Sequence, residues 1–150
     1  MPRPPVRPAQ PTDSERIREL QSLLAEPSDE LLSTALTEQE ATSPVRITRL
    51  FVTPDSSGRP VGYLLAVDGE PTHIAELAVD PEYRRQNRAT ALLDAICEAA
   101  AGSVTVCVAA TNRLARSLYE KRGFVETTRT AGQFESADGM TLRYDPENPS

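Results

Sequence analysis

The chain lacks several features that would mark a membrane, secreted, zinc-binding or nucleic-acid-binding protein. No apolar run among its 150 residues approaches the length that crosses a bilayer, and its proline-rich start lacks the apolar block of a secretory signal. Two cysteines and one histidine are too few for a four-ligand structural zinc site. Acidic residues outnumber basic ones by 22 to 16, which argues against a general nucleic-acid binder but leaves room for a local basic pocket. The chain is therefore predicted to be soluble and cytoplasmic, without a metal, nucleic-acid or membrane partner.

Three functional signatures are missing as well. No Gly-x-Ser-x-Gly elbow accompanies His73, the single histidine that a Ser-His-Asp hydrolase would have to use. Neither the phosphate loop Gly-x-x-x-x-Gly-Lys-Ser/Thr nor the dinucleotide pattern Gly-x-Gly-x-x-Gly occurs, which disfavours a nucleotide-binding switch. His73 is expected to be structural, and Cys97 and Cys107 are expected to be buried free thiols, because each lies among apolar neighbours.

What the chain does contain is a regular succession of apolar patterns with the periods of helices and strands. The predicted helices cover residues 12–24, 28–36, 88–100 and 112–122. The predicted strands cover residues 6–9, 45–52, 61–67, 74–79, 104–108, 124–130 and 140–144, with a polar loop at 37–44 and a turn at 137–139. The order is β-α-α-β-β-β-α-β-α-β-β, which indicates a single domain over residues 6–145. Residues 1–5 are expected to be a flexible proline-rich start and residues 146–150 a flexible tail.

Helical spacing also predicts which side chains face the core. On the first helix these are Ile17, Leu20, Leu23 and Leu24. On the last helix they are Leu114, Ala115 and Leu118.

The most informative segment runs from Val79 to Leu93. It has the pattern of a strand end, a tight polar turn and the first turns of an amphipathic helix. A turn that ends in a helix N-terminus directs several free backbone N–H groups to one point. Because Arg84 and Arg85 precede those donors, the segment suits a pyrophosphate, and we expect a phosphorylated cofactor.

A second segment, from Asn112 to Phe124, has the sequence Asn-Arg-Leu-Ala-Arg-Ser-Leu-Tyr-Glu-Lys-Arg-Gly-Phe. It resembles the Asn-x-x-Ala-x-x-Leu-Tyr-x-x-x-Gly-Phe segment of the GNAT superfamily of acetyl-CoA-dependent N-acetyltransferases, and residues 84–89 resemble that family's Arg/Gln-x-x-Gly-x-Gly/Ala loop. The resemblance extends from Val6 to Tyr144. It implies a GNAT-like α/β (α+β) fold with a mixed, mostly antiparallel central sheet flanked by helices.

The resemblance also implies roles for particular residues. The backbone of Leu77, Ala78 and Val79 would splay away from the next strand and pair with the pantetheine arm of acetyl-CoA. The amides from Arg85 to Thr90 would hold its pyrophosphate. The implied cofactor-binding residues of this loop are Arg84, Arg85, Gln86, Asn87, Arg88, Ala89 and Thr90. Asn112 would hydrogen-bond the cofactor arm, and Tyr119 would lie near the sulfur.

Two residues of the loop depart from the family pattern. Asn87 stands where the family has glycine, which reaches positive φ without a steric penalty. Asparagine is the next most tolerant residue in that region, so we expect the loop conformation to survive. Arg88 stands where an aliphatic residue is common, and its side chain could lie over the cofactor or face water.

Acetyl transfer by direct attack needs a neutral amine and a proton for the departing thiolate. Tyr119 fits the general acid, because a phenol with a pKa near ~10 is protonated at neutral pH. Glu76, on the strand before the loop, is the candidate base, acting directly or through water; a structural carboxylate is the alternative. In the resembling bacterial ribosomal-protein alanine acetyltransferases, the strand position of Cys107 carries the glutamate that serves as base.

The acceptor stays open between a protein N-terminal α-amine and a small-molecule amine. Its recognition is expected from residues 24–45 and 130–139. A non-catalytic acyl-CoA sensor on the same fold is the alternative function, since fold alone does not fix activity. The chain is expected to be a monomer or a homodimer, because strands are predicted at both ends of the sheet.

Overall fold

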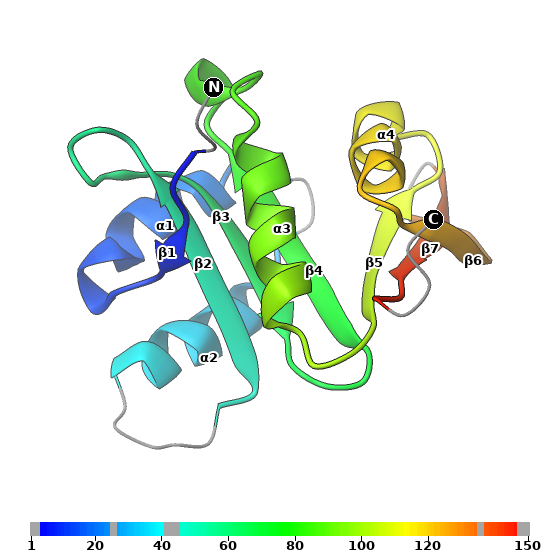
Figure 1. The fold of residues 1–150 in the computed structure, drawn as a ribbon, viewed down its shortest axis with the longest axis horizontal. Helices are drawn as coiled ribbons and strands as arrows, with labels where there is room; N and C mark the ends of the chain where they lie inside the picture. The colour runs from blue at the N-terminus through cyan, green and yellow to red at the C-terminus, as the bar shows by residue number, and fades with distance from the viewer. Residues whose placement is uncertain (1–3, 25–26, 41–45, 135–136, 147–150) are drawn as a thin grey trace.

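The computed structural model describes residues 4–24, 27–40, 46–134 and 137–146, and the order of its elements is the predicted one (Figure 1). The strands are β1 (Arg7–Pro8), β2 (Thr48–Pro54), β3 (Pro60–Val67), β4 (Thr72–Val79), β5 (Val104–Ala109), β6 (Val125–Phe134) and β7 (Ala137–Tyr144). The helices are α1 (Ser14–Gln21), α2 (Asp29–Glu40), α3 (Arg88–Ala99) and α4 (Arg113–Lys121), with short 3-10 turns η1 (Pro11–Asp13) and η2 (Pro81–Tyr83).

Within the described residues the strands form one sheet in the order β1-β2-β3-β4-β5-β7-β6. Every neighbouring pair is antiparallel except β4 and β5, which are parallel. The long connection from β4 to β5 contains α3, as a parallel pair requires. The predicted mixed, mostly antiparallel sheet is therefore confirmed.

Helices cover both faces of this sheet (Figure 1). One core cluster joins α3 and α4 to the sheet around the fully buried Leu92, Leu93 and Ile96. The other joins α1 and α2 to the opposite face around the fully buried Ile17 and Leu32. Burial of these apolar faces explains why a helix as short as α1 forms at all.

Several local predictions about these elements were wrong. Leu23 is 46% exposed because α1 ends at Gln21, so the helical spacing no longer applies to it. Leu114 is 87% exposed, although it lies one turn before the partly buried Leu118, because it stands in the first turn of α4. Residues 37–40, expected in a loop, form the last turn of α2.

The predicted turn at 137–139 belongs instead to β7, where Gly139 pairs with Ala109 on one side and Thr130 on the other. Pairing on both edges overrides the local turn signal. Parts of other predictions, at residues 1–3, 41–45 and 147–150, lie outside the described residues.

Candidate active site

The parallel strands β4 and β5 separate at one end of the sheet. Their ladder joins only residues 72–74 to residues 104–106, although β4 continues to Val79 and β5 to Ala109. A β-bulge precedes the opening, since Glu76 and Ile74 pair with successive residues of β3 and leave Ala75 as the extra residue. The backbone of residues 77–79 is therefore paired to β3 alone among the described strands, as the sequence predicted.

The turn that follows β4 is anchored by Asp80. One carboxylate oxygen of Asp80 accepts the backbone N–H of Glu82 at 2.9 Å, and the other pairs with Arg16 of α1 at 2.7 Å. These contacts, the amide hydrogen bond first and the Arg16 guanidinium second, lower the pKa of Asp80. The carboxylate therefore stays charged at neutral pH and ties the start of the loop to the opposite layer.

Two residues of the loop adopt left-handed backbone conformations. Asn87 has φ 63° and ψ 22° and stands at the N-cap of α3, which confirms the expected positive φ at this position. Arg85 has φ 64°. Sequence reasoning missed Arg85, because an arginine carries no local signal for this conformation.

The amides of residues 84–90 point to no acceptor within the described chain. The first amide of this region to find a partner is that of Ala91, which donates to the carbonyl of Asn87 at 3.0 Å. A hollow of about 210 Å³ lies over them, lined by Val79, Tyr83, Arg84, Arg85, Asn87, Arg88, Ala89, Thr90 and Leu118. Free amides at a helix N-terminus, with alternating left-handed residues before it, form a site for an anion.

The side chain of Arg88 is held by hydrogen bonds to the protein, so it neither lies loosely over this hollow nor extends into water. Its Nη1 donates to Thr53 Oγ1 at 2.9 Å and to the carbonyl of Pro54 at 3.0 Å, and its Nε donates to Gln86 Oε1 at 2.8 Å. Its guanidinium also lies 5.5 Å from the ring centre of Tyr83. The side chain therefore links the loop to the end of β2.

The second motif forms α4, and Asn112 caps it. Its Oδ1 accepts the backbone N–H of Ala115 at 3.1 Å, as expected of an N-cap residue. That bond leaves the Nδ2 donor of this exposed side chain available to a ligand.

Tyr119 lies on the inner face of α4. Only 4% of it is exposed, and its ring packs edge-on against Phe124 with centres 5.4 Å apart. Its hydroxyl makes no hydrogen bond with a described residue, yet the oxygen is not completely enclosed. Burial raises the pKa of this phenol, so the hydroxyl keeps its proton at neutral pH.

Glu76 is 3% exposed and lies on the face of β4 covered by α1 and α2. Its carboxylate accepts the hydroxyl of Tyr63 at 2.9 Å, the side-chain amide of Gln21 at 3.2 Å and the backbone N–H of Ser28 at 2.5 Å. Three donors, one each from β3, α1 and the segment before α2, surround the carboxylate, a network that the sequence did not indicate. Burial and the Glu76 charge together raise the pKa of Tyr63, which therefore acts as a donor.

The remaining candidates have simple environments. Cys97 is buried, as predicted, whereas the same prediction was wrong for Cys107, which is only partly buried. Burial raises the pKa of the Cys107 thiol, so at neutral pH it is not the base that a glutamate would be there. The Nδ1 of His73 lies 2.9 Å from Thr105 Oγ1, consistent with a structural role. Within the described residues no cluster of metal-ligating side chains occurs, and no helix there is long and apolar enough to span a membrane.

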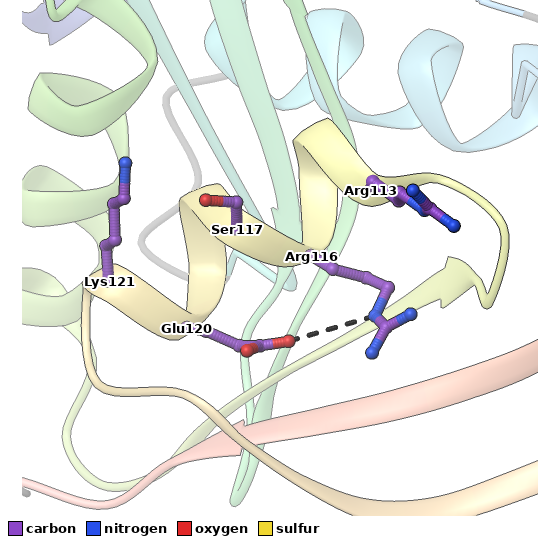
Figure 2. A pocket seen from close by; sticks show the side chains of 5 residues that line it. All are labelled: Arg113, Arg116, Ser117, Glu120 and Lys121. Atoms are coloured by element: carbon purple, nitrogen blue, oxygen red, sulfur yellow. Dashed lines mark ion pairs between the residues drawn. The ribbon is translucent and has the colours of Figure 1, made fainter.

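Three basic side chains of α4 line a second hollow (Figure 2). A hollow of about 500 Å³ is lined by Arg113, Arg116, Ser117, Glu120 and Lys121. Arg116 lies 3.8 Å from Glu120, whereas Arg113 and Lys121 make no ion pair with any described residue. Sequence reasoning attached no role to this hollow.

Residues 14–124 match the family model described as acetyltransferase (GNAT) family. The chain belongs to the GNAT acetyltransferase family. This match, which covers both motifs, confirms the predicted family and fold class.

Solved structures of low sequence identity share the fold of this GNAT chain. Arabidopsis thaliana NAA60 in complex with acetyl-CoA superposes with a TM-score of 0.79 at 19% identity over 96% of this chain and 99% of that one. The ribosomal-protein-S18-alanine N-acetyltransferase of Escherichia coli gives 0.76 at 20% identity over 94% and 92%. The spermidine/spermine N-acetyltransferase SpeG of Vibrio cholerae gives 0.74 at 18% identity over 95% of each chain.

A curated relative matches only a part. A mycothiol acetyltransferase of Clavibacter michiganensis is 44% identical over 54 residues, which are 36% of this chain and 18% of that protein. The GNAT chain therefore aligns with less than a fifth of this relative's length.

Proposed function

We propose that this GNAT chain transfers the acetyl group of acetyl-CoA to a primary amine by direct attack. The proposal rests on three features that lie together at one end of the sheet. The unpaired edge of β4, the open amides of residues 84–90 and the hollow that Leu118 of α4 shares with that loop all lie at the separated ends of β4 and β5.

The cofactor would be held mainly by backbone groups. Amides from Arg84 to Thr90 would bind the pyrophosphate, helped by the positive end of the α3 dipole. The free backbone edge of residues 77–79 would pair with the pantetheine amides, and the Nδ2 of Asn112 would donate to the same arm. The acetyl-CoA complex of the structural neighbour NAA60 supports this cosubstrate.

The chemical step would need no nucleophile from the protein. The neutral amine attacks the thioester carbonyl, and the C–S bond breaks as the carbonyl reforms. Tyr119 gives its proton to the departing sulfur, and the proton lost by the amine returns the phenolate to its neutral form. The raised pKa of Tyr119 supports this assignment, because the hydroxyl is protonated whenever acetyl-CoA arrives.

Before the attack, Glu76 would receive, through water, the proton whose loss converts the bound ammonium group into the neutral amine. Its 3% exposure and three hydrogen-bond donors leave little room for direct contact with an ammonium group. The same network holds the N–H of Ser28, immediately before α2, so Glu76 would also fix the α1–α2 segment where the acceptor is expected.

The acceptor would be an amine of moderate basicity. Deprotonating a lysine side chain near ~10.4 at pH 7 takes about 4–5 kcal/mol, against about 1 kcal/mol for an α-amine near ~7.7–8. A site whose only candidate base is enclosed suits the α-amine better. The S18-alanine acetyltransferase supports a protein N-terminus, and the spermidine acetyltransferase supports a small amine.

The test is thiol release from acetyl-CoA with a panel of amines, beside a calorimetric titration with acetyl-CoA alone. The panel contains an alanine-first peptide, the same peptide with a blocked N-terminus, and spermidine. Release that requires a free amine supports the transferase. Saturable binding without release on any amine would favour the acyl-CoA sensor, and no binding at millimolar coenzyme would end both proposals.

A further inference from the structure

Residues 84–90, here called the diphosphate loop, contain two residues in the left-handed conformation, Arg85 and Asn87, but no glycine. A side chain at positive φ crowds the backbone, and such a conformation persists only where its surroundings enforce it. The same conformation leaves the amides of residues 84–90 without internal acceptors. Contacts with residues outside the loop must therefore hold it in this shape.

Arg88 makes the contacts that can do so. It bonds Gln86 on the far side of Asn87, so its side chain bridges the left-handed residue. Its other end bonds Thr53 Oγ1 and the Pro54 carbonyl, which lie 35 and 34 residues away on β2. An arginine fork is suited to this, because several donors are fixed in one plane.

The anchor on β2 is rigid. Thr53 is fully buried and pairs with Gly62 of β3. A Cβ added at Gly62 would lie 2.9 Å from Thr53 Cγ2 and 3.1 Å from the Ala78 carbonyl, so the absent side chain lets β2, β3 and β4 pack closely here. The hydroxyl that receives Arg88 is therefore fixed relative to the strand that leads into the loop.

We propose that Arg88 is a positioning residue that holds the diphosphate loop open in place of the missing glycine. Its Nε and Nη1 are occupied by protein acceptors, and its effect on the cofactor passes through the conformation of Asn87. The inference rests on the proposed coenzyme site at residues 84–90.

The test is a double-mutant cycle read by calorimetric titration with acetyl-CoA. Arg88→Leu should weaken binding about tenfold, a change of about 1.4 kcal/mol. Asn87→Gly should bind at least as well as the native chain, because glycine needs no support at positive φ. Adding Arg88→Leu to Asn87→Gly should then weaken binding less than threefold. Equal losses in both backgrounds would overturn the proposal and make Arg88 a direct phosphate ligand.

Two further variants test the proposal even if the Arg88→Leu protein does not fold. Thr53→Val removes only the buried acceptor, and we expect two- to threefold weaker binding with an unchanged kcat at saturating acetyl-CoA. Arg88→Lys keeps the charge but not the fork, and it should bind nearly as weakly as Arg88→Leu. Native affinity in both variants would refute the positioning role. Arg129→Leu, which breaks only the exposed pair with Glu126 on β6, is the matched control.

Native protein that fails to bind acetyl-CoA would instead refute the proposed function. A purely structural role for Arg88 would lower the melting temperature of Arg88→Leu while leaving its affinity native, which also overturns the positioning proposal.

Discussion

Replacing Tyr119 with phenylalanine should separate chemistry from stability. The substitution removes one hydroxyl, while the ring that packs at 5.4 Å against Phe124 stays in place. No described residue hydrogen-bonds that hydroxyl, so its loss leaves no donor or acceptor unsatisfied. We therefore expect the free energy of unfolding to change by less than about 0.5 kcal/mol.

The same substitution should lower turnover strongly. A positioned general acid typically contributes 10²–10⁴-fold, and we expect kcat to fall at least tenfold, or by at least about 1.4 kcal/mol of barrier. Because burial raises the pKa of Tyr119, the phenol stays protonated from about pH 6 to 9. The loss should accordingly be the same at both ends of that range, and the native enzyme should show no alkaline decline from Tyr119.

The assay is thiol release at saturating acetyl-CoA with the best amine of the panel, beside calorimetry of acetyl-CoA binding, which should be unchanged. Tyr144→Phe is the matched control. It makes the same chemical change in the same aromatic cluster, where Tyr144 lies 5.7 Å from Phe124. Native turnover in Tyr119→Phe, or an equal loss in Tyr144→Phe, would remove Tyr119 from the mechanism.

Three further predictions concern the residues around the centre. Glu76→Gln removes the charge of the proposed proton acceptor and should lower kcat at saturating amine; a rise in the KM for the amine with an unchanged kcat would leave Glu76 only the role of holding Ser28. Cys97→Val should flatten the alkaline loss of stability. Burial raises the pKa of Cys97 from 9.0 to about 11, so the protonated thiol contributes about 3 kcal/mol to the free energy of unfolding below pH 9, and this contribution is lost as pH rises to about 11. Equilibrium unfolding by urea at pH 8 and pH 11 measures the loss. An equal loss of stability in the native chain and in Cys97→Val would contradict the assignment. Asp80→Ala removes a cap and the pair with Arg16, and should lower the free energy of unfolding by about 1–2 kcal/mol, whereas Asp80→Asn, which can still cap, should cost under about 1 kcal/mol.

The parts of the site that the sequence predicted are those encoded locally. The segment from Val79 to Leu93 carries its strand, turn and helix cap within fifteen consecutive residues, and the structure has each of them there. The segment from Asn112 to Phe124 likewise contains its own cap and stop. The left-handed conformation of Asn87 followed from its place in a motif where glycine is usual.

What the sequence could not predict are contacts between distant segments. Arg88 finds its acceptors on β2, and Glu76 finds one donor 55 residues earlier, on Gln21. No periodic pattern links such positions, because the pairing depends on how the layers stack. The prediction that Leu114 is buried was wrong for a related reason. Helical spacing gives the direction of a side chain around α4, but the position of the sheet decides which side chains contact it.

The distribution of charge, rather than its sum, explains how an acidic chain can suit an anionic cofactor. Residues 84–122 contain seven basic and three acidic residues, although the whole chain carries a net charge of −6. Arg122 is balanced by Asp94 at 2.6 Å, whereas Arg113 and Lys121 on α4 pair with no described residue (Figure 2). Because charges are screened beyond a Debye length of about 8 Å, phosphates in the hollow at residues 84–90 would experience Arg84 and Arg85 more strongly than acidic residues far from the loop. The acid excess that argues against nucleic-acid binding thus lies outside the segment proposed to bind the coenzyme.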